Sequence, residues 1–119
     1  MNRLHTVGKS VIRVDALEKA TGQAIYCGDV VLPRLLHAKV LRCPYPHARI
    51  VRLDASKARS LPGVVFVATG EHAPAKKLGA IIYDEDVITK DVARAVGAPV
   101  AAVAAETADI AEQAIGLID

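Results

Sequence analysis

The stretch that decides the fold is Arg42-Cys43-Pro44-Tyr45-Pro46-His47-Ala48-Arg49-Ile50. Each of its two prolines fixes φ at about −65° and pushes the preceding residue out of the helical region. The stretch is therefore predicted to form a stiff turn between two extended runs. It contains no combination of side chains typical of a catalytic site, so its predicted role is structural.

The runs on either side of this turn have the pattern of strands. Residues 35–42 alternate between apolar and polar side chains, as in a half-buried strand, with Leu36, Ala38 and Val40 on the face predicted to be buried. Residues 47–54 are similarly apolar, although Arg49 and Arg52 fall on opposite faces. We predict that the two runs pair as a hairpin.

Downstream, a short helix and two buried strands are predicted. Asp54 is placed to accept hydrogen bonds from the first turn of a helix through Ala55, Lys57 and Ala58, which ends at Leu61-Pro62-Gly63. Residues 64–68 and 100–105 are continuous apolar runs, the pattern of strands covered on both faces. Both are predicted to lie centrally in a sheet.

The last segment has the clearest helical pattern. Thr107 can cap it, and Asp109 places negative charge in its first turn. Apolar residues recur at helical spacing on one side, at Ala111, Ala114, Ile115 and Ile118, while Asp109, Glu112, Gln113 and Gly116 lie opposite. A strand that leads directly into a helix resembles half of a β-α-β unit. By contrast, residues 7–24 contain Gly8 and Gly22 between short apolar pairs, which predicts an extended arm without a stable helix.

Composition limits the possible classes of protein. The 119 residues suffice for one domain, residues 1–119, and with 3% aromatic residues its core must be aliphatic. The net charge of +2 comes from scattered residues, which argues against a nucleic-acid or membrane partner. Neither a membrane-spanning run nor an export signal is found. We therefore expect a cytoplasmic protein.

Two cysteines, Cys27 and Cys43, stand 16 positions apart and match neither a redox pair nor a zinc pattern. A disulfide or a reactive thiol is one interpretation. The other, which we favour, is two reduced and partly buried residues that act as small apolar groups.

A search for a site finds no catalytic, cofactor-binding or metal-binding residue. The glycines form no phosphate-binding spacing, and the four histidines are dispersed. His47 lacks a nearby carboxylate, and Arg42 and Arg49 are expected to pair with acidic neighbours or pack their stems. The Asp84-Glu85-Asp86 and Lys76-Lys77 runs have no ligand spacing, so they are interpreted as solvated loops.

Three blocks of sequence, in the same order as in a known family, carry a resemblance. They are the arm Val7-Gly8-Lys9 with Arg13-Val14-Asp15-Ala16 and Glu18-Lys19-Ala20-Thr21-Gly22, the segment 32–50 that begins with Leu32-Pro33 and ends with the 42–50 turn, and Gly97-Ala98-Pro99-Val100-Ala101-Ala102-Val103-Ala104-Ala105-Glu106-Thr107. Together they resemble the N-terminal α/β hammerhead domain in the large subunit of the molybdenum hydroxylases. That family includes xanthine dehydrogenase, aldehyde oxidase, carbon monoxide dehydrogenase and hydroxybenzoyl-CoA reductase. The resemblance implies an α+β fold: an α/β hammerhead with a mixed sheet and a few short helices.

The resemblance also implies a function that resides elsewhere. Members of this family are oxidoreductases that use molybdopterin, with iron–sulfur clusters and FAD on partner subunits or domains. In these enzymes the catalytic segments follow the hammerhead domain. The chain is then an inactive N-terminal fragment, whose 42–50 turn and 7–22 arm shape contacts with the rest of the large subunit. Tyr45-Pro46 and residues 72–90 depart from the family pattern, and the latter favour the hydroxybenzoyl-CoA reductase or xanthine dehydrogenase branch.

Two further expectations remain. An unfilled strand position beside the last helix predicts that the fragment self-associates. A stand-alone regulatory or small-molecule-binding α+β module is the alternative function, because such a site can be built without a motif.

Overall fold

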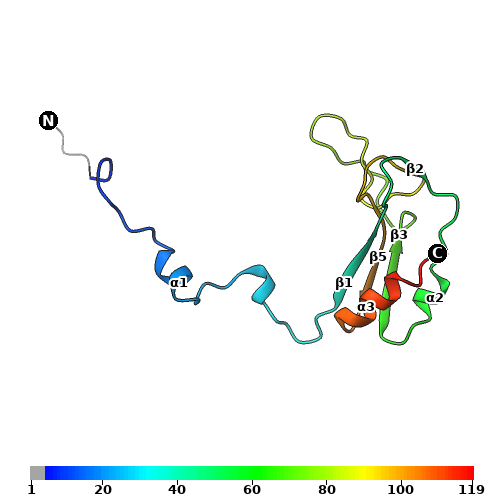
Figure 1. Ribbon diagram of the computed structural model, residues 1–119, viewed down its shortest axis with the longest axis horizontal. Helices are drawn as coiled ribbons and strands as arrows, with labels where there is room; N and C mark the ends of the chain where they lie inside the picture. The colour runs from blue at the N-terminus through cyan, green and yellow to red at the C-terminus, as the bar shows by residue number, and fades with distance from the viewer. Residues whose placement is uncertain (1–4) are drawn as a thin grey trace. The chain divides into compact units, whose positions relative to one another are not determined.

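The computed structural model describes residues 5–119 and divides into two compact units, Met1–Pro33 and Arg34–Asp119 (Figure 1). The first unit holds the helix α1 (Ala16–Ala20) and the 3₁₀ turn η1 (Cys27–Asp29). The second holds the remaining elements in the order β1 (His37–Arg42), β2 (Ala48–Arg49), α2 (Ser56–Arg59), β3 (Val64–Thr69), β4 (Val92–Ala93), β5 (Pro99–Ala105) and α3 (Ala108–Ile115). These elements confirm the predicted α+β class.

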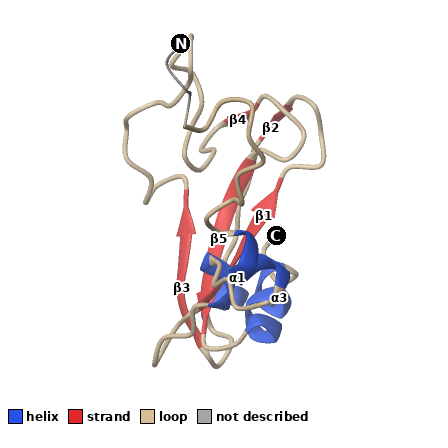
Figure 2. Ribbon diagram, turned by 90° about the vertical axis from the view of Figure 1, so that its left-hand side faces the viewer, coloured by secondary structure: helices blue, strands red, loops and turns tan. Residues whose placement is uncertain are grey.

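The main sheet has three antiparallel strands in the order β1-β5-β3, with β5 in the centre (Figure 2). The register aligns Lys39 of β1 with Val103 of β5 and Val67 of β3. The prediction that residues 100–105 form a central strand is therefore confirmed. The same prediction for residues 64–68 is wrong, because β3 is an edge strand whose Val65 bulges out of register and is exposed.

The predicted hairpin between residues 35–42 and 47–54 does not form. Instead, β1 pairs with β5, and β2 pairs with β4 in a separate two-stranded ladder. The reason lies in the turn between them. Pro44 and Pro46 cannot donate a backbone hydrogen bond and hold the chain extended, so residues 43–47 lead away from the sheet and do not reverse onto β1.

The helices α2 and α3 cover one face of the main sheet (Figure 1). The core between them contains Val67, Val103, Ala55, Ala58 and Ala114, with larger aliphatic side chains packed around it. An ion pair of 2.7 Å joins Lys39 Nζ of β1 to Glu112 Oε2 of α3. Lys39 thus shares the helix-covered face with Val67 and Val103. The core is aliphatic, as the composition predicts.

The opposite face of the sheet is not covered by any element of the second unit in the described part of the chain. Register places Ala38, Ala104 and Phe66 in one row and Val40, Ala102 and Ala68 in the next. Val40 and Phe66 are 39% and 52% exposed. The prediction that Ala38 and Val40 lie on a buried face is therefore wrong. Alternation shows that two faces differ, but not which of them the helices select.

The predicted cap at Thr107 is confirmed, whereas the N-cap of α2 is Ala55, one residue after the predicted Asp54. The Thr107 hydroxyl accepts a hydrogen bond from the Ile110 N–H at 3.2 Å, at the N-terminus of α3. The Asp54 carboxylate accepts from the Ser56 N–H at 3.0 Å, at the start of α2. In α3, Ala111 and Ala114 are buried whereas Asp109, Glu112 and Gln113 are exposed, as predicted.

The first unit corrects one prediction, because residues 16–20 form the helix α1 where no stable helix was expected. Its sequence Ala-Leu-Glu-Lys-Ala consists of strong helix formers. Asp15 lies 2.6 Å from Lys19 and 2.5 Å from Arg13, which stabilises the first turn. Within residues 5–119, no helix has the length and apolar character required to cross a membrane.

Candidate functional site

The 42–50 turn forms one wall of an apolar groove of about 520 Å³. The groove is lined mostly by aliphatic and aromatic side chains from the turn, the segment after it, β5 and the C-terminus, among them Leu41, Tyr45, Ile50, Val51, Val100 and Ile118. Val51 and Tyr45 are 90% and 62% exposed. An open apolar groove of this kind is suited to receive another polypeptide segment rather than to perform chemistry.

Hydrogen bonds fix the start of the turn. The Cys43 N–H donates to Ala98 O at 2.9 Å, and the Gly97 N–H donates to Cys43 O at 2.8 Å. The guanidinium of Arg42 adds a third bond, from Nη1 to Gly97 O at 2.8 Å. Arg42 thus stabilises the loop before β5 instead of pairing with an acidic neighbour. The predicted structural role of the turn agrees with these contacts.

Asp119, which also lines the groove, pairs with Asp54. Their backbones exchange two hydrogen bonds, 2.7 Å from Asp54 N to Asp119 O and 3.0 Å in return. Hydrogen bonds from Ser56, with a further contribution from Arg52, lower the pKa of Asp54 to about 2. This carboxylate is therefore held in its charged form at the start of α2.

The sequence candidates do not converge on one point. His47 and Arg49 are exposed, and within residues 5–119 neither makes a side-chain hydrogen bond or ion pair. Lys77 pairs with Asp86, and Arg94 donates to the Asp84 backbone carbonyl at 3.2 Å. The two charged runs are thus loop residues, as predicted.

The two cysteines are free thiols in different environments. Cys43 is buried, and its thiol donates to Tyr45 O at 3.6 Å. Cys27 is exposed. The prediction of two reduced residues agrees with these positions, but the prediction that both are partly buried is wrong for Cys27, which lies in a 3₁₀ turn with no buried residue.

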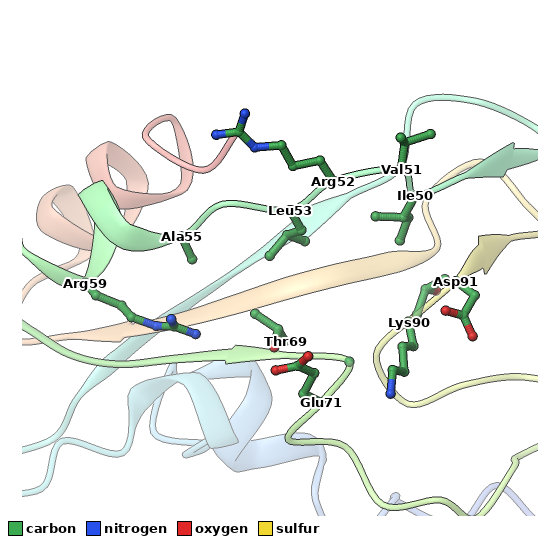
Figure 3. Close-up of a pocket in the computed structure, with 12 residues that line it drawn as sticks. Ile50, Val51, Arg52, Leu53, Ala55, Arg59, Thr69, Glu71, Lys90 and Asp91 are labelled. Carbon is green, nitrogen blue, oxygen red and sulfur yellow. The ribbon is translucent and has the colours of Figure 1, made fainter.

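A second hollow, of about 300 Å³, was not predicted from the sequence (Figure 3). It lies between residues 50–55, α2, the end of β3 and residues 89–91, and carries both positive and negative side chains: Arg52, Arg59, Lys90, Glu71 and Asp91. Thr69 and Thr89 are buried at its edge. Four separate segments contribute these residues, so no local motif could have revealed the hollow.

His72 orders the end of β3 beside this hollow. Its Nδ1 accepts a hydrogen bond from the Thr69 N–H at 3.2 Å and lies 3.0 Å from the Thr69 hydroxyl. The His72 N–H donates in turn to Thr69 O at 2.9 Å, and its ring packs edge-on against Phe66. These contacts give His72 a structural role in the turn.

Within residues 5–119, no group of three or more His, Cys, Asp or Glu side chains could hold a metal ion. The groove also carries the charged residues Arg42, Arg49, Arg52 and Asp119, and the hollow carries side chains of both signs, but neither brings three such ligands together. The described residues therefore offer no set of side-chain ligands for a metal ion.

Residues 21–119 match the family described as "Aldehyde oxidase and xanthine dehydrogenase, a/b hammerhead domain". The chain belongs to this family. The resemblance noted in its sequence and the predicted hammerhead fold are thus confirmed.

Two curated relatives show the extent of the similarity. The chain is 42% identical over 113 residues to the nicotinate dehydrogenase large molybdopterin subunit of Eubacterium barkeri, covering 94% of the chain and 27% of that protein. It is 44% identical over 110 residues to a probable xanthine dehydrogenase subunit of Bacillus subtilis, covering 92% of the chain and 15% of that protein. The chain therefore spans about a quarter or less of the relatives that it matches.

Solved structures agree in fold. The chain is similar to CO dehydrogenase from Oligotropha carboxidovorans with a TM-score of 0.83 and 30% identity, over 94% of the chain and 14% of that protein. It is similar to quinoline 2-oxidoreductase from Pseudomonas putida 86 with a TM-score of 0.80 and 36% identity, over 94% of the chain and 15% of that protein.

Proposed function

We propose that residues 1–119 form one hammerhead domain within the large, molybdopterin-binding subunit of a molybdenum-dependent oxidoreductase, and that the domain contributes no catalytic residue. The observation that carries this proposal is the family match over residues 21–119, together with the small share of each relative that the chain spans.

The substrate of the whole enzyme is proposed to be a nitrogen-containing heteroaromatic compound. The names of three similar proteins, nicotinate dehydrogenase, xanthine dehydrogenase and quinoline 2-oxidoreductase, refer to such compounds. These proteins share 36–44% identity with the chain, compared with 30% for CO dehydrogenase. The heteroaromatic class is therefore favoured over carbon monoxide.

The surfaces of the domain suit a role in assembly. The groove beside the 42–50 turn and the exposed apolar side chains of residues 7–22, such as Val14 and Leu17, would contact the rest of the large subunit. Iron–sulfur and FAD subunits are the proposed partners beyond it. Three relatives are themselves named as subunits: of nicotinate dehydrogenase, of a probable xanthine dehydrogenase and of a 6-hydroxypseudooxynicotine dehydrogenase complex.

The cytoplasm is the proposed location. Cys27 is an exposed free thiol and Cys43 a buried one, and unpaired thiols are the usual state of cysteine in a reducing compartment. Fractionation of cells that produce the protein, followed by immunodetection in the cytoplasmic and membrane fractions, tests this location.

Metal analysis tests the function directly. Purified 119-residue chain is expected to contain no stoichiometric molybdenum, whereas the full polypeptide that carries it, isolated from its natural host, is expected to contain molybdenum and pterin. The full enzyme should reduce a dye acceptor with nicotinate, xanthine or quinoline as electron donor. Stoichiometric molybdenum in the short chain, or its absence from the full polypeptide, would contradict the proposal.

The stand-alone binding module is the alternative, and the hollow of Figure 3 is the feature that such a module would use. The family match argues against it, because the matched relatives carry the same segment as a minor part of much longer chains.

A further inference from the structure

The loop between β3 and β4 carries three consecutive large apolar residues that are mostly exposed to solvent. Ile81, Ile82 and Tyr83 are 92%, 71% and 69% exposed. In Figure 1 this yellow-green loop extends beyond the sheet. Exposed apolar residues are normal when they stand singly, but a contiguous group of this kind marks a contact surface.

The loop is held in one shape by specific contacts. Leu78 and Glu85 form an antiparallel bridge, with hydrogen bonds of 2.8 Å from Leu78 N to Glu85 O and 3.0 Å in return. The ion pair between Lys77 and Asp86 lies directly outside this bridge. Arg94 donates to the Asp84 carbonyl at 3.2 Å and ties the loop to the segment after β4. Ile81, Ile82 and Tyr83 thus lie in a loop whose base is held by hydrogen bonds and an ion pair.

Gly79 makes the tight bend at the start of the loop possible. Its φ of 153° is one that other residues rarely adopt, and a Cβ at this position would overlap the Ile82 carbonyl. The backbone at Gly79 therefore lies directly against the Ile82 carbonyl, which closes the bend below the exposed side chains. A preformed apolar tip loses little conformational freedom when it binds.

The charges beside the three apolar residues indicate whether their partner is a lipid surface or a protein. Lys77 neutralises Asp86, and Arg94 is bound to a carbonyl, so the carboxylates nearest the tip, those of Asp84 and Glu85, remain exposed without an ion pair in the described part of the chain. Negative charge beside an apolar tip disfavours an anionic lipid surface. It favours an apolar recess in a protein whose rim carries Lys or Arg.

We propose that residues 78–85 form a docking element, which inserts Ile81, Ile82 and Tyr83 into an apolar recess with a cationic rim on a neighbouring part of the assembled enzyme. This inference rests on the proposed function, because it requires a larger assembly around the domain. Its occupant is protein, and binding to a lipid surface is the outcome that would contradict it.

Hydrogen exchange in the full enzyme provides the first test. Amides 79–85 are expected to exchange at least tenfold more slowly in the full enzyme than in the isolated 119-residue chain. The double variant I81D/I82D should abolish this protection and reduce the yield of assembled enzyme. V65D is the matched control, because Val65 is 56% exposed in the same unit and lies on β3, outside the loop and the residues that brace it. It should assemble normally.

A photoreactive phenylalanine derivative at position 83 provides the second test. It is expected to cross-link to a single peptide that contains apolar residues flanked by Lys or Arg. A full enzyme that contains molybdenum, but whose tip amides exchange as fast as in the isolated chain and form no such cross-link, overturns this inference alone. A full polypeptide without molybdenum overturns the proposed function and this inference with it.

A vesicle sedimentation assay distinguishes binding to a protein recess from binding to a lipid surface. The isolated chain should not sediment with vesicles of phosphatidylcholine and phosphatidylglycerol. Sedimentation that the I81D/I82D double variant abolishes would show that the tip binds lipid, and it would overturn the assignment to a protein recess.

Discussion

Asp54 and Asp119 face each other across two reciprocal backbone hydrogen bonds of 2.7 and 3.0 Å, the geometry of a hydrogen-bonded pair in an antiparallel ladder. The C-terminus of the chain is thereby tied to the start of α2. The Asp54 carboxylate also accepts hydrogen bonds from Arg52 and from the Ser56 N–H, so one residue links the 52–56 segment to the C-terminus and braces that segment itself.

Acid should weaken this junction. The pKa of Asp54 is lowered to about 2 from its ordinary value of 3.8, so its charged form is favoured in the folded state. Its contribution is fully present above about pH 4 and is lost as the pH falls from about 4 to about 2. Asp54→Asn keeps an oxygen that can accept from Ser56 but does not titrate. The melting temperature of the parent should therefore fall more steeply over this range than that of the variant, as followed by circular dichroism. Equal slopes would contradict the assignment.

Enlarging a buried alanine should destabilise the core. Ala114 of α3 is fully buried against Val67 and Val103. Ala114→Leu replaces a fully buried methyl group with an isobutyl group and is expected to cost about 1–3 kcal/mol in the free energy of unfolding. Ala95→Leu at an exposed position should change it by less than about 0.5 kcal/mol. Urea denaturation measures both, and a neutral Ala114→Leu would show that the core is loosely packed.

Gly70 should not tolerate a side chain. A Cβ there would lie 2.6 Å from Lys90 Cα and 3.0 Å from Lys90 N, so the two segments beside the hollow would have to separate. We expect Gly70→Ala to lower the free energy of unfolding by about 1–3 kcal/mol, the usual range for substitutions that force the backbone to shift. Gly28→Ala is the control, because no atom lies within 4 Å of the added Cβ. If both variants melt alike, the close approach of residues 70 and 90 is not a constraint.

The two thiols should differ in reactivity. Exposed Cys27 is expected to react with a thiol reagent within seconds in the native protein, and buried Cys43 only on unfolding. The double variant Cys27→Ser, Cys43→Ser should have a free energy of unfolding within about 1–2 kcal/mol of that of the parent. The loss should arise from poorer packing at position 43. A melting temperature that depends on reductant would reveal a cross-link and contradict this prediction.

Self-association is expected of the isolated chain. The main sheet has free edges at β1 and β3, and its open face displays Val40 and Phe66. Sedimentation should detect a dimer or larger species at high concentration. Val40→Lys places a charge on the open face and should shift the distribution toward monomer. A parent that remains monomeric at high concentration would rule out this behaviour.

Local patterns predicted local structure well. Thr107 caps α3 as expected, Asp54 accepts a hydrogen bond from the first residue of α2, and the apolar run before Glu106 is the central strand, because each of these features depends on neighbours within a few residues. The partners of strands were harder to predict. The two prolines of the 42–50 turn prevent β1 and β2 from pairing, and nothing near Val92 in the sequence shows that it will pair with Arg49.

In the candidate site, too, features set by nearby residues could be predicted and features set by the fold could not. The structural importance of residues 42–50 could be predicted, since prolines restrict the chain wherever they occur. The hollow of Figure 3 could not, because Ile50, Thr69 and Lys90 meet only through the fold. The docking loop was also missed. Its Ile81-Ile82-Tyr83 run is too short to distinguish a buried strand from an exposed tip.

The contact between β5 and α3 is made largely of methyl groups. Ala101 and Ala105 on the strand and Ala111 and Ala114 on the helix are all inaccessible to solvent. An alanine has no rotatable side-chain torsion, so this layer has no alternative arrangement to adopt when a neighbour changes. Substitutions there should be accepted over evolution only in matched pairs, one larger and one smaller, whereas the loops around this rigid centre are free to diverge with each new partner.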